Sequence, residues 1–533
     1  MNVKLAMVGL LAVSAVVRLI ASATLGLGND EAYHALYAAH PAASYFDHPP
    51  MMAWVEMAGL ALSGGSDDPW ALRIGFIALF AGSTLLLARL TARQYGPTAG
   101  FLAALALNLT GYYGLAASMF ALPDGPLLFF WLLTLDRMTL ALTGPEEAQT
   151  RRWLEAGVAW GGALLSKYHA VFLPMGAAAF MLLDARGRRQ LLRPGPYLAA
   201  LIGLIAFSPV LYWNAGHDWA SFRFQGNRAV GGLTPRPDLL AITLLAQAGY
   251  LFPWIWLPLI AGLVRAWRSW RSEPTGPERL WICVATLPLA AFTAVALFRP
   301  VLPHWGLIGL VSLFPLLGRR WADRLEHHPA STQRRLAVCT GLSLLLVSLA
   351  VTEYRTGWFQ RGGSASGGGF RLANGLGLLD TRTDPTLDLY GWDQVADRIR
   401  RLGLVDEPGS FIFTRYWYQS AQLSHALGPG RPALCYNKDD PRGFAFWSRP
   451  EDWIGHDGVL VLVGPEPEAF VRYFGRWFTR VEPAADFEVE RHGKPVRRIR
   501  LYHCIHQRTA FPFSLDKVEQ LARPDAPAGR TVR

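Results

Sequence analysis

Two neighbouring carboxylates, Asp30 and Glu31, directly follow the first long apolar stretch of the sequence. An ionisable group costs about 2.5–3.5 kcal/mol at the centre of a membrane span, so acids that persist beside apolar stretches are candidates for function. A carboxylate in such a position can orient an acceptor hydroxyl or remove its proton. The alternative is that Asp30 only caps a helix that starts with Glu31, because aspartate is a favoured N-cap residue.

Two more acidic positions stand beside prolines. Asp47 and His48 precede Pro49-Pro50, and Asp124 follows Pro123 at the start of another apolar stretch. An acid next to an imidazole offers groups for acid–base chemistry. Each position also suits a turn or a helix cap, so the residues alone leave both interpretations open.

Cations and imidazoles between apolar stretches are suited to a phosphate ligand. Lys167 stands near His169 between two such stretches, although a lysine there could also extend its ammonium group toward the membrane surface. The arginines of the 214–228 segment are interleaved with aromatic residues. Arginine forks bind phosphate bidentately, while aromatic rings cover sugar faces or lie at the membrane interface. The members of this group are Lys167, His169, Arg223, Arg228, Arg299 and His304.

These residues are distributed over a chain with the composition of a membrane protein. Of its 533 residues, 51% are hydrophobic and only 17% are charged, whereas soluble domains carry about a quarter charged residues. A span takes about 20 apolar residues. We therefore predict an α-helical polytopic membrane protein with about 11 spans. The predicted spans are 4–25, 73–92, 98–118, 124–142, 153–167, 169–183, 196–213, 239–263, 280–298, 304–318 and 336–353.

The arginines predict how the chain crosses the membrane. They cluster in five alternate connections, near 89–93, 151–152, 186–193, 265–279 and 319–335, and such connections are typically cytoplasmic. The N-terminus is then cytoplasmic, and an odd number of spans places the C-terminal tail outside. Arg18 interrupts the first apolar stretch, so we expect an uncleaved span rather than a signal peptide. The net charge of +11 is spread over these loops and indicates no nucleic-acid partner.

The chain is expected to have two parts. Residues 1–355 form the transmembrane part, with a long external first loop at 26–72 that includes an interfacial helix near 50–64. A Gly/Ser-rich linker at 356–375 leads to an external α/β domain at 376–533. Its predicted strands are 411–414, 431–436 and 459–463, and its predicted helices are 391–403, 416–427 and 466–476. A disulfide between Cys435 and Cys504 is left open.

The order of the polar motifs resembles that of a known family, the GT-C membrane glycosyltransferases. The closest resemblance is to the bacterial branch related to the lipid A aminoarabinose transferase and to protein O-mannosyltransferases, over roughly residues 5–320. The family implies an inverting sugar transfer from a polyprenyl-phosphate donor to a lipid or glycan acceptor, outside the bacterial inner membrane. The motifs are Asp30-Glu31-Ala32-Tyr33, Tyr45-Phe46-Asp47-His48-Pro49-Pro50, Arg73, Leu122-Pro123-Asp124, Ser166-Lys167-Tyr168 and Leu302-Pro303-His304.

The resemblance also implies roles for single residues. Asp30, Glu31 and Asp124 match catalytic acids, and Lys167 matches a lysine near the donor phosphate. Asp47-His48-Pro49 stands where the aminoarabinose enzymes carry Glu-Lys-Pro, which implies a phosphate contact for His48 and a possible divalent metal ion at Asp47. The remaining assignments are Arg223, Arg228 and Arg299 for donor phosphate, and Tyr33, Tyr45, His169 and His304 for acceptor or sugar.

Two other classes of function compete with this interpretation. A transporter or flippase for lipid-linked sugars would usually show internal repeats and broken helices near the midplane. A non-catalytic envelope scaffold would leave the ordered acids and cations without a purpose. The sequence names neither the sugar nor the acceptor.

Overall fold

The structure is a computed structural model that describes residues 2–66, 68–229, 234–272, 276–360, 379–381, 384–406, 408–428, 430–431 and 433–512. Residues 361–375 of the predicted linker lie outside the described residues. The chain divides into two compact units. Unit 1 comprises Met1–Thr24, Ala42–Phe222 and Ala229–Leu345, and unit 2 comprises Leu25–Pro41, Arg223–Arg228 and Leu346–Arg533.

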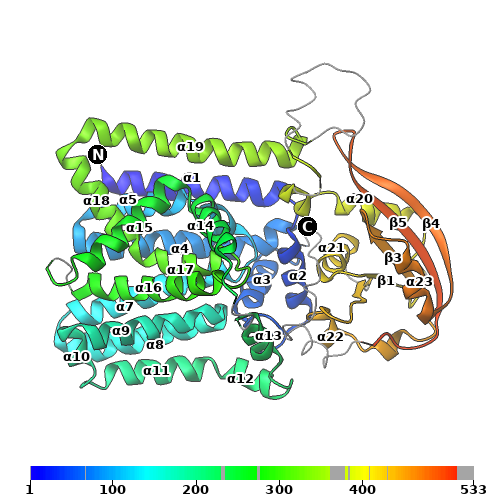
Figure 1. The fold of residues 1–533 in the computed structure, drawn as a ribbon, viewed down its shortest axis with the longest axis horizontal. Coiled ribbons are helices and arrows are strands. Elements are labelled where there is room, and N and C mark those ends of the chain that lie inside the picture. Colours follow the sequence, from blue (N-terminus) through cyan, green and yellow to red (C-terminus); the bar gives the residue numbers. More distant parts are fainter. Residues whose placement is uncertain are drawn as a thin grey trace. The chain divides into compact units, whose positions relative to one another are not determined.

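Unit 1 is built of helices, most of which run side by side along its length (Figure 1). Short helical turns at Tyr112–Ala116, Tyr168–Val171 and Val311–Leu313 join some of them. Two helices, α13 and α19, continue from unit 1 into unit 2. The helices are α1 (Val3–Thr24), α3 (Met51–Leu62), α4 (Pro69–Tyr95), α5 (Pro97–Asn108), α6 (Ala117–Met119), α7 (Asp124–Thr143), α8 (Glu146–Ser166), α9 (Phe172–Leu183), α10 (Ala185–Gln190), α11 (Gly195–Ala206), α12 (Ser208–Ala215), α13 (Ala220–Ala229), α14 (Pro237–Leu251), α15 (Pro253–Arg268), α16 (Gly276–Ala296), α17 (His304–Leu310), α18 (Phe314–His327) and α19 (Pro329–Thr356).

The number of single helices long enough to span a membrane is smaller than predicted. By length and composition, the described residues contain five such helices, α1, α4, α7, α16 and α19, or up to eight if each bent pair is one span. The pairs α5 with α6, α11 with α12, and α14 with α15 bend by 83°, 45° and 115°. In the last pair, Phe252 has a φ of 62° and Pro253 cannot continue the hydrogen-bond ladder. The predicted count of 11 is therefore not reproduced, and tail orientation cannot be deduced from an odd count.

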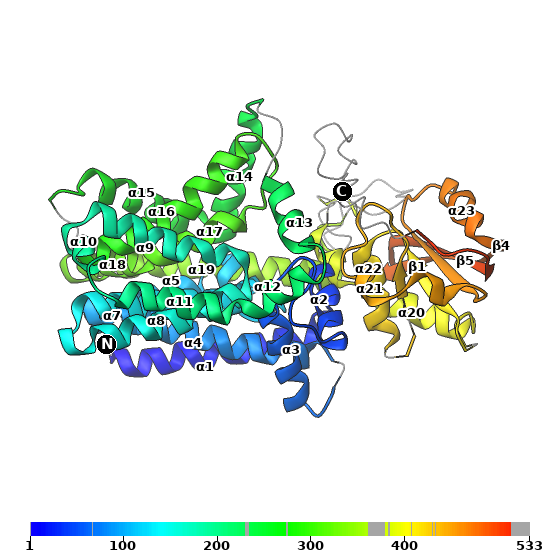
Figure 2. The same cartoon turned by 90° about the horizontal axis from the view of Figure 1, so that it is seen from below.

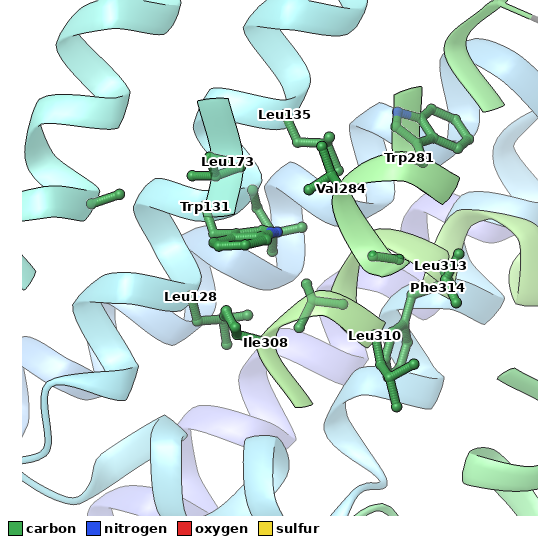
Figure 3. Close-up of a cluster of buried hydrophobic side chains, with 14 of the residues drawn as sticks. Leu128, Trp131, Leu135, Leu173, Trp281, Val284, Ile308, Leu310, Leu313 and Phe314 are labelled. Carbon is green, nitrogen blue, oxygen red and sulfur yellow. The ribbon is translucent and has the colours of Figure 1, made fainter. Parts of the chain in front are cut away.

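The core of unit 1 lies where α7, α9, α16 and α17 meet (Figure 3). Trp131 and Trp281 are fully buried among leucine and valine side chains. A buried indole N–H in a membrane protein needs a partner within the protein. Trp131 donates to the Ser312 hydroxyl at 3.0 Å, and Trp281 donates to the Thr139 hydroxyl at 2.9 Å. These two bonds fix the rotation of α7 and α16 about their axes.

The five arginine-rich connections lie at one end of unit 1, together with the N-terminus (Figure 1, Figure 2). Ion pairs join neighbouring connections at this end, which we call the basic end. Buried carboxylates of α7, α16 and the α9–α10 turn accept most of these bonds. The pairs are Arg93–Asp136 at 2.5 Å, Arg193–Glu146 at 2.6 Å, Arg279–Asp184 at 2.6 Å and Arg319–Glu278 at 2.8 Å.

Unit 2 contains a five-stranded mixed sheet with the order β2-β1-β3-β5-β4. The strands β1 (Phe411–Thr414), β2 (Ala433–Cys435) and β3 (Gly458–Val463) are parallel, and β4 (Phe478–Arg491) and β5 (Lys494–Gln507) form an antiparallel hairpin beside β3. The six elements predicted in the tail are present. The hairpin was not predicted, because its strands are rich in charge and alternate only partly. The helices are α2 (Asn29–Ala39), α20 (Trp392–Arg401), α21 (Trp417–Leu427), α22 (Phe444–Trp447) and α23 (Ala469–Phe474), with short turns at Pro385–Leu389, Pro450–Trp453 and Gly475–Trp477.

All four cysteines are free. Cys435 lies on β2 and Cys504 on β5, which are separated in the sheet by β1 and β3. Three strand spacings amount to about 14 Å, and a disulfide needs Cα atoms closer than about 7 Å. The sheet order therefore excludes the pairing that the sequence left open.

Helix α2 packs on the C-terminal elements of unit 2 although it follows the first helix in sequence. Tyr33 is fully buried, and its hydroxyl accepts a hydrogen bond from the Gly443 N–H at 2.9 Å. Trp417 packs edge-on against the Tyr33 ring, with 5.0 Å between centroids. Gln422 donates to the carbonyl of Leu27 at 2.8 Å. The beginning and the end of the chain thus form one structural unit.

Adding a methyl group at Gly443 should weaken the packing of α2 on the C-terminal elements of unit 2. A Cβ atom there would lie 2.5 Å from the Trp447 ring and 2.9 Å from the Tyr33 hydroxyl. We expect Gly443→Ala to destabilise unit 2 by about 1–3 kcal/mol through overpacking, measured as faster hydrogen exchange in α2 and α22 of the full-length protein. Gly475→Ala is the control, because its nearest contact would be an ordinary 3.6 Å. Equal exchange in both variants would contradict the packing role of α2.

Candidate functional site

Asp124 and Lys167 form a buried ion pair within unit 1. Asp124 is the first residue of α7, directly after Pro123. Lys167 ends α8 in an extended conformation, with φ −159° and ψ 142°, which turns its side chain out of the helical path. The Lys167 Nζ atom lies 2.9 Å from Oδ1 and 2.8 Å from Oδ2 of Asp124. The two residues are only 5% and 8% exposed.

This pairing changes the electrostatic role predicted for Lys167. A lysine that already binds both oxygens of a carboxylate is not an isolated positive charge. Removing one member of a buried pair leaves the other charge uncompensated, at a cost of about 3–5 kcal/mol. An incoming phosphate must therefore share Lys167 with Asp124 or displace it.

Two predicted histidines lie within electrostatic range of this pair, and a third lies within range of one of them. Asp124 interacts with His304 and His169, and His169 in turn interacts with His48. Tyr112 was not predicted as a site residue; it hydrogen-bonds to Asp124 and stacks on His304 with ring centroids 5.2 Å apart. Its position in an apolar stretch gave no signal of this contact. We call Asp124, Lys167, His48, His169 and His304 the Asp124 cluster.

The cluster lies at the end of unit 1 opposite the basic end. Asp124 begins α7, and the same helix ends at Thr143 next to one of the arginine-rich connections. Twenty helical residues span about 30 Å, which is close to the thickness of the hydrocarbon core. The cluster and the arginines are therefore separated by about one membrane thickness.

The segment that carries Asp47 is held against the 214–221 region of unit 1. The Ser221 hydroxyl donates to the Tyr45 carbonyl at 3.0 Å, and Asn214 accepts the Ser221 N–H at 3.1 Å. Asp47 is 2% exposed and lies within electrostatic range of Tyr168. No group of three His, Cys, Asp or Glu residues able to hold a metal ion occurs among the described residues. The residues around Asp47 do not form a ligand set of their own, so we derive no step through a metal ion.

The two tyrosines assigned to sugar or acceptor binding are both buried. Tyr33 is enclosed by aromatic rings of unit 2, and its hydroxyl is bonded to the backbone. Tyr45 is 3% exposed, and burial raises the pKa of its phenol to about 12. Buried aromatic side chains offer no face for a sugar to cover. Binding of sugar or acceptor by Tyr33 and Tyr45 stays a prediction, which the burial of both side chains does not favour.

The predicted phosphate-binding arginines lie in two segments of the chain. Arg299 is half-buried in the segment before α17. Arg223 is exposed on α13 and belongs to unit 2. Arg228 is also on α13, but its side chain lies outside the described part of the chain. Phosphate binding by these three arginines stays a prediction.

Asp30 and Glu31 have different roles in α2. Glu31 is buried and accepts the Gly28 N–H at 2.9 Å, so Glu31, and not Asp30, closes the helix start. Asp30 is exposed in the first turn, with no hydrogen bond or ion pair to a described residue. The N-terminal turn of a helix favours negative charge. Asp30 is therefore available to a ligand, and a catalytic role for Glu31 stays a prediction.

A second carboxyl group, which the sequence analysis missed, lies near Asp30 within unit 2. Burial raises the pKa of Asp388, and the Asp30 charge raises it further, against the opposing charge of Arg497. Arg497 donates to the Leu387 carbonyl at 2.6 Å, and its guanidinium lies 4.7 Å from the Trp392 ring centroid. More than 350 residues separate Asp30 from Asp388 in the sequence, so no local pattern could have joined them.

Unit 2 also contains a buried glutamate beyond the carboxyl end of β3. Burial raises the pKa of Glu466 to about 7, although Arg415 and Arg500 act in the opposite direction. One oxygen of Glu466 accepts the Val463 N–H at 2.9 Å. The protonation state of Glu466 is therefore coupled to the stability of the C-terminal end of β3.

Comparisons with known proteins find similar sequences among membrane glycosyltransferases. A family model described as dolichyl-phosphate-mannose-protein mannosyltransferase matches residues 47–213. The lipid A galacturonosyltransferase RgtD from Rhizobium johnstonii is 29% identical over 271 residues, which are 50% of this chain and 54% of that protein. The chain thus matches about half the length of this curated relative.

Solved structures of membrane transferases share the fold. ArnT from Cupriavidus metallidurans in the apo state has a TM-score of 0.59 at 16% identity, covering 93% of this chain and 97% of that chain. The same protein bound to undecaprenyl phosphate has a TM-score of 0.58 at 15% identity, with the same coverage. The oligosaccharyltransferase AglB from Archaeoglobus fulgidus has a TM-score of 0.50 at 12% identity, covering 85% and 69%.

The class that the fold and these matches define is that of the GT-C membrane glycosyltransferases, to which the chain is related. Within this class, the sequence matches a protein mannosyltransferase family model and a lipid A galacturonosyltransferase, and ArnT shares the fold. The resemblance predicted from the ordered acids and cations is therefore confirmed.

Replacing one residue of the Asp124–Lys167 pair should lower the stability of unit 1 more than replacing both. We expect Lys167→Met to destabilise unit 1 by about 3–5 kcal/mol, because Asp124 is left buried without its counterion. The double variant Asp124→Asn/Lys167→Met should recover most of this loss. Thermal unfolding of the purified full-length protein in detergent measures both. Equal destabilisation of the single and double variants would show that the pair is not electrostatically coupled.

Unit 2 should lose stability with rising pH through Glu466. The native pKa is about 7, and an unfolded glutamate titrates near about 4.3. The native state therefore holds the proton more tightly, and this stabilisation is complete below about pH 4 and lost as the pH rises through 7. We expect the opening free energy of β3, from hydrogen exchange, to fall by about 2–3 kcal/mol between pH 5 and 8.

The variants Glu466→Gln and Glu468→Gln separate this effect from other titrations. Glu466→Gln should remove the pH-dependent fall, because glutamine carries no titrating proton. Glu468 is 77% exposed, so Glu468→Gln should retain the wild-type profile. If both variants keep the fall, a group other than Glu466 causes it.

Proposed function

We propose that this protein is an inverting glycosyltransferase that moves a sugar from a polyprenyl-phosphate donor to an envelope acceptor, lipid A or another periplasmic glycan or lipid. The reaction takes place at the outer face of a bacterial inner membrane. The names of the relatives support the class of reaction: RgtD is a lipid A transferase, and ArnT has been solved with undecaprenyl phosphate. The observation that carries the proposal is the Asp124 cluster.

The location of the cluster supports the outer face. Arginine-rich connections are typically cytoplasmic, and the cluster lies about 30 Å from them, along the length of α7. The headgroup of a lipid-linked donor lies at the membrane surface, where such a cluster can contact it. A phosphate leaving group needs no general acid if cations stabilise its growing charge. Lys167 can provide this stabilisation, and the imidazoles of the cluster can donate hydrogen bonds to the phosphate oxygens.

The proposed reaction is a single displacement. The acceptor oxygen bonds to the anomeric carbon of the sugar, while the bond between that carbon and the donor phosphate oxygen breaks. The electron pair of the broken bond remains on the polyprenyl phosphate, which leaves with an additional negative charge. For a hydroxyl acceptor, the proton passes to the Asp30 carboxylate; an acceptor phosphate is already anionic, and Asp30 then orients it.

We choose Asp30 rather than Glu31 as the base, because Glu31 already forms a hydrogen bond at the start of α2. Glu31 is buried and bonded to Gly28, whereas Asp30 is exposed and has no partner among the described residues. Asp124 is bonded to Lys167 through both oxygens, so a role in placing the cation suits it better than proton transfer. The proposal requires Asp30 and the Asp124 cluster to face the same substrate.

A transporter or flippase for lipid-linked sugars is the second candidate. The broken pair α14 and α15, bent by 115°, is a feature that transporters use at their substrate sites. The match to a mannosyltransferase family model over residues 47–213 favours the transferase. Purified protein in proteoliposomes discriminates the two, because only a transferase changes the mass of an acceptor.

The reaction should depend strongly on Asp30. We expect Asp30→Asn to lower the rate of sugar transfer by about 10²–10⁴-fold, the range typical of general base catalysis, with unchanged unfolding. The assay is mass spectrometry of lipid A, envelope glycans and polyprenyl phosphates from a deletion strain complemented with each variant. A wild-type amount of product from Asp30→Asn would show that another group accepts the proton.

Asp393→Asn is a matched control for this substitution. Asp393 is exposed in the first turn of α20, two residues after a glycine N-cap, as Asp30 is in α2. Both substitutions therefore remove one favourable charge from a helix start in unit 2. Equal losses of product from the two variants would indicate an effect on folding rather than on catalysis.

A further inference from the structure

A cavity of about 540 Å³ opens at the basic end of unit 1, between α15, α16 and α18. Four arginines line it: Arg265 from α15, and Arg319, Arg320 and Arg324 from α18. Two carboxylates, Glu278 and Asp323, are also part of the lining. Four positive charges against two negative charges leave a surplus of two positive charges within the cavity.

Both carboxylates are paired with the same arginine. Arg319 lies 2.8 Å from Glu278 and 3.8 Å from Asp323. Arg265, Arg320 and Arg324 have no side-chain ion pair with any carboxylate in the described ranges. Burial lowers the pKa of Arg320, and the charges of Arg265 and Arg324 lower it further. The three guanidinium groups therefore repel one another, and an anion placed between them would relieve this repulsion.

Most of the other residues that line the cavity are apolar. The apolar lining includes Leu259 and Gly262 of α15, Ile282 of α16 and Leu316 of α18. On the outer surface of α15, Leu257 and Val264 are 56% and 44% exposed, as expected of a helix that faces hydrocarbon. A cationic opening with an apolar wall fits a molecule that has an anionic headgroup and acyl chains.

We propose that this cavity binds the phosphate headgroup of an anionic phospholipid from the leaflet at the basic end, which is the cytoplasmic leaflet by the positive-inside rule. Arg265, Arg320 and Arg324 hold the phosphodiester, since guanidinium forks bind phosphate oxygens bidentately. Basic pockets between transmembrane helices are known to bind lipid headgroups in this way. The site is separate from the Asp124 cluster, and it does not depend on the proposed transferase activity.

Lipid binding by native mass spectrometry tests the proposal on the full-length protein. The purified protein is delipidated in detergent and titrated with phosphatidylglycerol, with zwitterionic phosphatidylcholine as the comparison lipid. We expect one phosphatidylglycerol to bind well above the level of phosphatidylcholine. The double variant Arg265→Gln/Arg320→Gln should weaken this binding by about 30-fold, on the basis of about five-fold for each arginine.

Two further variants control for folding and for total charge. Arg268→Gln/Arg334→Gln removes the same number of charges from exposed positions on α15 and α19 that do not line the cavity, and it should bind the lipid as the wild type does. Arg320→Lys keeps a cation and should retain most of the binding. Equal weakening in the two double variants, or equal binding of the two lipids, would overturn the proposal.

Two other titrations separate the possible sources of the phosphate. Inorganic phosphate at the same concentration should not compete, because it lacks acyl chains. Undecaprenyl phosphate tests whether the cavity is instead a second site for a carrier lipid. Competition by inorganic phosphate, or displacement of the bound phosphatidylglycerol by undecaprenyl phosphate, would contradict the assignment to a bilayer phospholipid.

Discussion

The buried ion pair between Asp124 and Lys167 is the interaction on which the arrangement of unit 1 depends. It joins the start of α7 to the end of α8, two helices whose other ends meet at an arginine-rich turn. A carboxylate and an ammonium group can remain in an apolar bundle only when each compensates the other. The backbone of Lys167 leaves the helix to make this possible, and His169 then follows in the adjacent short turn. Positions that look like separate polar residues in the sequence are thus one charge-compensated group.

The two ends of unit 1 use charge differently. At the Asp124 end, a single carboxylate balances a lysine among imidazoles. At the basic end, ion pairs such as Arg93–Asp136 and Arg279–Asp184 join neighbouring connections, and the cavity beside α18 retains unpaired arginines. Charge that is compensated within the protein fixes helices, whereas surplus charge is available to ligands.

The sequence predicted well what depends on local patterns and less well what depends on distant contacts. Asp124 and Lys167 were recognisable because charged residues beside apolar stretches are costly, and β1 and β3 were recognisable as short apolar runs. The count of 11 spans is not confirmed: the helices of the described residues are long and apolar enough for five to eight spans, and the predicted stretches 153–167, 169–183 and 304–318 are not among them. The burial of Tyr33 could not be predicted, because its partners, Trp417 and Gly443, are about 400 residues away. The sequence did not distinguish Asp30 from Glu31; the structure does so through the hydrogen bond that Glu31 accepts from Gly28.

The packing of α2 on the last part of the chain has a consequence for biosynthesis. Membrane helices insert in order from the N-terminus, and domains generally fold as they emerge. Helix α2 leaves the ribosome early, yet Gly443 and Trp417, which hold Tyr33, are synthesised last. The residue that we propose as the base therefore acquires its surroundings only when translation is nearly finished. Prematurely terminated chains would enter the membrane without the residues against which α2 packs. Such an incomplete protein would lack transferase activity.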